Sequence, residues 1–152
     1  MGVYANTVSI SQFTITGDLP ERDEFDWFSG KLASRAFRSI ENSSDELSEG
    51  WTQVDHPDDA VFDVPATCWR DQYLVFSLRR DQRKVPAAVL KSHTSREEGA
   101  FLSQHPNLRR TPKNKRDEIR EQVQLRLLTR CLPVPSMVDV VWDRKSGVLT
   151  LF

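Results

Sequence analysis

Alternating apolar and polar positions mark the strands of this chain. Residues 8–16, VSISQFTIT, alternate with a period of two and are rich in β-branched side chains, which predicts a half-buried strand. Residues 71–84 contain the apolar run YLVF, which predicts a central strand buried on both faces. Two shorter apolar groups predict strands at residues 50–54 and 60–64.

A helical period first appears in residues 17–40. Asp18 can cap this helix, Pro20 falls in its first turn, and an apolar stripe runs from Phe25 to Phe37. Carboxylates near its start and arginines near its end suit the helix dipole. We expect the aromatic side chains of this stripe to belong to the core rather than to a ligand site.

Two further helices are expected to form a hairpin-shaped arm over residues 86–132. A proline ends the preceding strand and opens a helix over residues 87–104, which Gly99 should interrupt. Thr111 as the N-cap and Pro112 as the first helical residue predict the second helix. Because its apolar residues gather toward its C-terminal end, that end should dock and the N-terminal end should project.

The C-terminal residues 136–152 alternate around a turn at 143–147, which predicts a β-hairpin. The chain ends within the second strand of this hairpin, as expected of a fragment or of a short form. Local strand pairing combined with segregated helices is typical of α+β proteins. We therefore predict an α+β fold: one domain over residues 1–152, with an antiparallel sheet, packed helices and the projecting helical hairpin.

Length and cysteine content narrow the class of protein. A chain of 152 residues can bury a core without disulfides. Cys68 and Cys131 lie far apart, without a CxxC motif, so neither a zinc site nor a disulfide framework is indicated. No uncharged stretch is long enough to span a bilayer, and no signal peptide is apparent. These features predict a cytoplasmic protein without membrane contact.

The formal net charge of −1 hides a division between the two halves of the chain. Residues 1–68 carry four Lys and Arg against thirteen Asp and Glu, or −9, and residues 69–152 carry seventeen against nine, or +8. A basic half suggests an anionic partner. The alternative is that the two halves neutralise each other within the fold.

Motifs for catalysis or metal binding are sparse. Asp58, Asp59 and Asp63 could form the acidic part of a nuclease magnesium site. The acidic-x-Lys element that would support such a site is missing, so an acidic solvated loop is the favoured interpretation. The chain also lacks GxSxG, GxxxxGK[ST] and GxGxxG motifs. We predict no enzyme activity, no cofactor and no metal site.

Cations gather in two groups, one at the end of the strand over 71–84 and one at the head of the helix that follows Pro112. The first group is Arg79, Arg80, Arg83 and Lys84, and the second is Arg109, Arg110, Lys113, Lys115 and Arg116. Arg120 lies further along the same helix as the second group. Cations placed on phosphates release counterions and so bind DNA without reading its sequence. Nearby carboxylates at helical spacing could instead pair with these cations and leave only a solvated face.

Four segments follow one another in the order of a known family. They are YLVFSLRRDQRKVPAAVLK, a polar helical spacer, LRRTPKNKRDEIREQVQLRLLTRCLP and VDVVWDRKSGVLTL. In this order they resemble the N-terminal half of the bacterial recombination-associated RdgC family. The resemblance covers residues 70–152 well and residues 1–69 in broad outline, and Thr129 and Cys131 depart from the proline and alanine of the family pattern.

The resemblance implies a non-enzymatic, nucleoid-associated homodimer that binds double-stranded DNA. Members of this family form a ring around duplex DNA, lined by positive charge, and restrain the RecA recombinase by occupying the DNA. In the family the tip of the helical arm meets its partner and closes the ring, and Leu132 falls where the family places an apolar dimer contact at that gate. A second half contributes to the base of the ring in full family members.

Two other classes of function stay open from the residues alone. One is a protein-interaction module that docks its helical hairpin on an acidic partner. The other is a metal-dependent nuclease that uses the three aspartates near residue 60. Salt-sensitive DNA retention distinguishes DNA binding from protein docking, and magnesium-dependent cleavage distinguishes the nuclease from both.

Overall fold

The computed structural model describes residues 9–17 and 23–152. Its strands and helices confirm the predicted α+β class. The strands are β1 (Ser11–Thr14), β2 (Leu47–Thr52), β3 (Trp69–Arg70), β4 (Tyr73–Gln82), β5 (Val134–Asp143) and β6 (Val148–Leu151). The α-helices are α1 (Glu24–Ser34), α2 (Ala87–Gln104) and α3 (Lys113–Leu128), and a 3-10 turn spans Pro65–Thr67.

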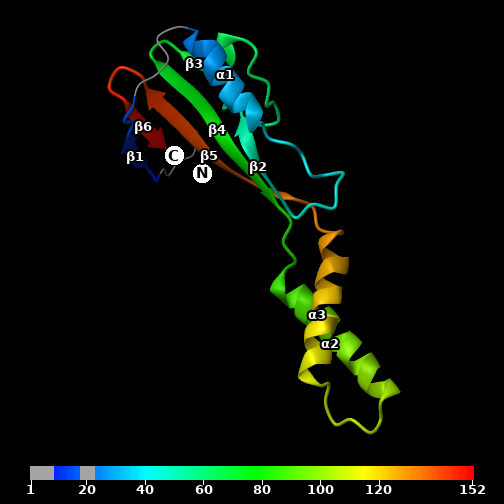
Figure 1. Cartoon of the computed structure of the whole chain (residues 1–152). Coiled ribbons are helices and arrows are strands. Elements are labelled where there is room, and N and C mark those ends of the chain that lie inside the picture. The colour runs from blue at the N-terminus through cyan, green and yellow to red at the C-terminus, as the bar shows by residue number, and fades with distance from the viewer. Residues whose placement is uncertain (1–8, 18–22) are drawn as a thin grey trace.

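The strands form one antiparallel sheet in the order β1-β6-β5-β4-β2, with β3 also paired to β4 (Figure 1). β4 pairs with β5 along its whole length, from Tyr73 opposite Asp143 to Gln82 opposite Val134. This arrangement confirms the predicted central strand. The predicted C-terminal hairpin is also confirmed, because β5 and β6 pair around a turn in which Gly147 has a positive φ of 71°.

Helix α1 covers one face of the sheet and forms the main core with it (Figure 1). Phe28 and Leu32 of α1 are buried against Leu74 and Phe76 of β4 and against Trp142 of β5. Burial of each such side chain contributes roughly 1.5–3 kcal/mol. Phe28 of the predicted stripe therefore belongs to the core and Phe25 packs against it, as expected, whereas Phe37 lies against the Arg79 guanidinium.

The helix is shorter than predicted. The proposed cap Asp18 and the proline two residues later lie outside the described residues, and α1 begins after Asp23, which adopts a left-handed conformation with φ of 55°. At its other end the backbone leaves the helix to pair with β2: the Phe37 amide donates to the Trp51 carbonyl at 3.0 Å, and the Trp51 amide donates to the Arg35 carbonyl at 2.9 Å. These bonds between distant residues end the helix at Ser34.

Gly50 allows this close pairing. A Cβ atom at position 50 would lie 2.4 Å from the Cα and the amide nitrogen of Phe37. Contacts this short with backbone cannot be relieved by a side-chain rotation. The segment beyond α1 can therefore lie along β2 only because this position lacks a side chain.

Three strand predictions need correction. The prediction at residues 60–64 is wrong, because this segment is irregular; Phe62 is buried there and Gln53 Nε2 donates to the Val61 carbonyl at 2.7 Å. The strand predicted at 50–54 lies at 47–52, and β3, of two residues, was not predicted. β1 is exposed rather than half-buried, with Phe13 54% exposed, and Val8 lies outside the described residues.

The two helices α2 and α3 form the predicted arm, which projects from one end of the sheet (Figure 1). Ile119, Val123 and Leu127 form a second hydrophobic cluster with α2 residues Leu90 and Phe101. This cluster is separate from the core beneath α1. The arm therefore has its own small core. No helix in the described part of the chain is both long and apolar enough to cross a membrane.

The predicted helix ends within the arm need small corrections. α2 runs through Gly99 without a break, because glycine costs only about 1 kcal/mol in an exposed helix. The N-cap of α3 is Pro112 rather than Thr111, and it makes no side-chain capping bond. The Thr111 hydroxyl is buried and has no hydrogen-bond partner among the described residues.

Candidate functional site

The arm and the rest of the chain have net charges of opposite sign. Residues 86–132 carry ten Lys and Arg against five Asp and Glu, or +5. The rest of the chain carries eleven against seventeen, or −6. The positive charge thus lies on the part of the molecule that projects, where a large anionic partner can reach it.

The tip of the arm is the most positive part of the molecule. Residues 105–116, the loop between the helices and the first turn of α3, contain five cations and no carboxylate: Arg109, Arg110, Lys113, Lys115 and Arg116. Figure 1 shows this loop at the end of the arm farthest from the sheet. The first three are exposed and make no ion pair with any residue that the structure describes. Their charge is therefore available to a partner.

The position of three of these cations opposes local helix stability. Lys113, Lys115 and Arg116 lie in the first turn of α3, which contains no acidic residue. The amino end of a helix carries partial positive charge, so each cation there is unfavourable by about 0.3–1 kcal/mol. Only two of them have carboxylate partners, since Lys115 Nζ lies 2.9 Å from Glu118 and Arg116 Nε lies 3.8 Å from Glu98. Folding alone does not explain this arrangement.

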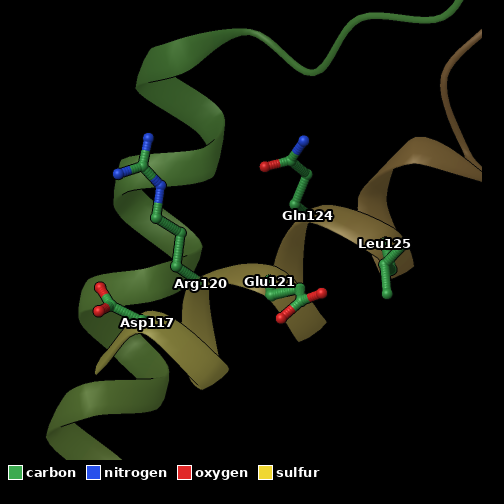
Figure 2. A pocket seen from close by; sticks show the side chains of 5 residues that line it. All are labelled: Asp117, Arg120, Glu121, Gln124 and Leu125. Atoms are coloured by element: carbon green, nitrogen blue, oxygen red, sulfur yellow. The ribbon is translucent and has the colours of Figure 1, made fainter. Parts of the chain in front are cut away.

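The side of α3 that faces away from α2 carries mixed charges. Ile119, Val123 and Leu127 point toward α2, so residues about half a turn away point outward. Figure 2 shows a pocket on this helix, lined by Asp117, Arg120, Glu121, Gln124 and Leu125. The interpretation as a solvated face with mixed charges therefore fits the outer side of α3 but not the tip.

The group of cations at the end of β4, all four of which were predicted to contact DNA, is only partly accessible. Arg83 is 6% exposed, and its guanidinium donates to five backbone carbonyls. The acceptors are the carbonyls of Ile40, Glu41, Ser43, Asp45 and Cys131. Arg83 therefore connects the loop after α1 to the root of the arm, and its donors are used by the fold.

Arg79 is also occupied within the fold. Its side chain is 11% exposed, pairs with Asp81 at 2.8 Å and with Asp58, and stacks on the Phe37 ring at 4.4 Å. The hydrogen bonds that Arg79 donates to the Asp81 carboxylate are the largest cause that raises the pKa of Arg79 above its ordinary value. The other two members of the group are exposed: Arg80 pairs with Glu49 at 3.1 Å, and Lys84 makes no ion pair within the described chain.

The predicted contact residue Leu132 is exposed but lies elsewhere than expected. It is 82% exposed and sits between the end of α3 and the start of β5. This is the root of the arm, whereas the resemblance placed the contact at the tip that closes a ring. The exposure of this leucine fits a contact residue, and its role in dimerisation stays a prediction.

The aspartates near residue 60 do not converge on one point. Asp58 pairs with Arg79, and the Asp59 carboxylate accepts the Val61 amide at 2.8 Å. Asp63 is exposed. Within residues 9–17 and 23–152, no group of three or more His, Cys, Asp and Glu side chains is placed to hold a metal ion.

Polar residues of α2 also belong to the site, and the sequence did not single them out. Lys91, Thr94, Ser95 and Glu98 line a groove between α2 and α3, opposite Arg120. Their spacing in the sequence could have identified them. Residues three and four apart share one face of a helix, and these residues, which follow the inward-facing Leu90, lie at such intervals from one another. Which residues of α3 they face depends on how the two helices pack against each other, and the spacing within α2 does not reveal this.

One family model matches nearly the whole chain. Its description is "Putative exonuclease, RdgC", and it matches residues 9–151. The matched range contains both the sheet and the arm. No match was found among curated proteins.

Proposed function

Because the chain belongs to the RdgC family of recombination-associated proteins, we propose that it binds double-stranded DNA without sequence preference and modulates homologous recombination. The arm contacts phosphates, and the protein restrains RecA by occupying the DNA. A homodimer at the nucleoid is the form that would act. The net negative charge of the rest of the chain repels DNA, so that the arm is the part of the molecule presented to it.

The cations at the arm tip are the observation that carries this proposal. Residues 105–116 contain five cations and no carboxylate, and the three cations in the first turn of α3 reduce local helix stability. The phosphate backbone supplies one negative charge per about 1.7 Å of duplex axis, so a rigid group of cations can contact several phosphates at once. Such contacts position a protein on DNA and do not read its sequence.

Salt dependence is the first expected result. If about 4 to 6 phosphates are neutralised, the logarithm of the association constant should fall with the logarithm of salt concentration with a slope of roughly −4 to −5. Fluorescence anisotropy with two duplexes of unrelated sequence measures this slope, and both should give the same affinity. No binding at low salt, or a slope near zero, would contradict the proposal.

Protein docking is the alternative that the charge distribution also permits. A basic arm can bind an acidic protein surface with a similar dependence on salt. Competition between the two partners distinguishes the alternatives. If the arm is a DNA-binding element, unlabelled duplex should displace labelled duplex at equal concentrations, whereas a polyglutamate chain of the same net charge should compete more weakly.

Nuclease activity is a second candidate function, because the family description names an exonuclease. The separation of the aspartates near residue 60 argues against a metal site in the described residues. End-labelled duplex incubated with the protein and with magnesium or manganese should therefore stay intact. Cleavage that is lost in Asp58→Ala would instead support the nuclease.

A further inference from the structure

The groove between α2 and α3 on the Arg120 side has a volume of about 340 Å³. Three cations line it, Lys91 from α2 and Arg116 and Arg120 from α3. Lys91 and Arg120 are exposed, and neither makes an ion pair with another described residue. The α2 side of the groove also contains Leu90, Thr94, Ser95 and the carboxylate of Glu98, which lies 3.8 Å from Arg116.

A hydroxyl donor is also left unused in this groove. Thr94 Oγ1 is buried and has no hydrogen-bond partner within the described chain. Buried polar atoms in folded proteins almost always have a partner, so an unsatisfied one calls for an explanation. Ammonium, guanidinium and hydroxyl donors together are the groups that bind phosphate oxygens.

The groove on the opposite side of the hairpin differs in this respect. Its two cations, Lys115 and Arg126, each have a close carboxylate: Lys115 lies 2.9 Å from Glu118, and Arg126 lies 2.8 Å from Glu97. The bond from Arg126 is the main cause that lowers the pKa of Glu97. The positive charge on this side is therefore neutralised locally, and the two sides of the arm are not equivalent.

We infer that the Lys91–Arg120 groove is a binding site for a phosphodiester of the DNA backbone, with Lys91 and Arg120 as its charged donors. The inference rests on the proposed DNA binding and specifies which side of the arm contacts the DNA. DNA that contacts the tip then continues along this groove, and the neutralised groove faces away from the duplex. A pocket of this volume has room for a phosphate together with part of its sugar.

Two carboxylates line this site, and both limit its affinity for a phosphate: Glu98, which lies 3.8 Å from Arg116, and Asp117. Asp117 lies beside Arg120 on α3 (Figure 2). A like charge near a phosphate is unfavourable, and no ion pair holds Asp117 within the described residues. Removal of this charge in Asp117→Asn should therefore strengthen DNA binding several-fold.

The test compares a variant that lacks both groove cations with a variant of Arg126, which lies on the other side of the arm. Arg120→Gln combined with Lys91→Gln should weaken duplex binding roughly tenfold or more and reduce the salt slope by about 2, whereas Arg126→Gln should change either quantity little. Fluorescence anisotropy at several salt concentrations provides both readouts. Circular dichroism shows whether each variant keeps its helices, and a variant that lost them would be replaced by Lys91→Gln alone, with an expected slope change of about 1.

The outcomes separate this inference from the proposed function. If wild-type protein fails to bind duplex, the proposed function fails. If wild type binds but the groove variant keeps the wild-type affinity and slope, the groove inference is wrong and DNA binding stands. Addition of inorganic phosphate tests the other source of the same chemistry: if millimolar phosphate shifts the NMR signals of Lys91 and Arg120 and duplex does not, the groove is a site for a free anion.

Discussion

Replacement of Arg109, Arg110 and Lys113 by glutamate should abolish DNA binding at physiological salt and leave the protein folded. The change removes three cations that make no ion pair in the described chain. If each lost phosphate contact costs about tenfold, affinity should fall by roughly 10³-fold, and the salt slope should decrease by about 3. The loss should be equal on unrelated duplex sequences, because phosphate contacts carry no base information.

The same variant should lose DNA binding without losing stability. Lys113→Glu places a carboxylate in the first turn of α3, where it interacts favourably with the helix dipole. The melting temperature should therefore stay constant or rise slightly while DNA binding is lost. A protein that loses binding only because it unfolds cannot show this combination.

Three cations outside the arm offer a control with the same change in charge. Lys31, Arg35 and Arg38 are also exposed, and they lie in and just after α1, away from the arm. Their replacement by glutamate changes the net charge by the same six units and should weaken binding only slightly, through screened long-range repulsion. If the tip variant melts normally and binds DNA like wild type, the tip cations are only a solvated face, and the arm acts through protein contacts.

Arg83→Met should destabilise the protein by about 3 kcal/mol or more. The substitution removes a buried guanidinium and leaves the carbonyls that it bound without donors. One of these is the carbonyl of Cys131 at the root of the arm, and the others belong to the loop after α1. Urea unfolding, followed by tryptophan fluorescence, measures the loss.

A neighbouring arginine provides the control. Arg80 leaves the same end of β4, but its side chain is 48% exposed and pairs only with the equally exposed Glu49. Arg80→Met should change the free energy of unfolding by no more than about 1 kcal/mol. Equal losses in the two variants would show that the buried bonds of Arg83 contribute little beyond an ordinary surface contact.

Local patterns predicted the elements whose stability depends on nearby residues. The apolar run of β4 and the alternation around Gly147 identified the central strand and the last hairpin, because burial of consecutive residues fixes both. The cations of the arm tip were found for a similar reason. A loop between two helices exposes its charges wherever the helices pack.

Long-range contacts explain the predictions that failed. Nothing around Arg83 in the sequence indicates that carbonyls of residues 40–45 and of Cys131 enclose it. The end of α1 depends on Trp51 and on the missing side chain of Gly50. The groove between α2 and α3 also combines residues more than twenty positions apart, so periodicity within one helix could not reveal it.

The pairing of β4 with β5 gives the arm a particular place in the topology. The last pair at that end of the two strands is Gln82 opposite Val134, and these two residues enclose the whole arm between them. The arm is thus an insertion in the loop of a β-hairpin. Such an insertion can change in length or be exchanged for another without any change in strand order, because the sheet needs only that its two ends stay neighbours. The reach of the arm and its charge can therefore diversify among relatives while the sheet is kept.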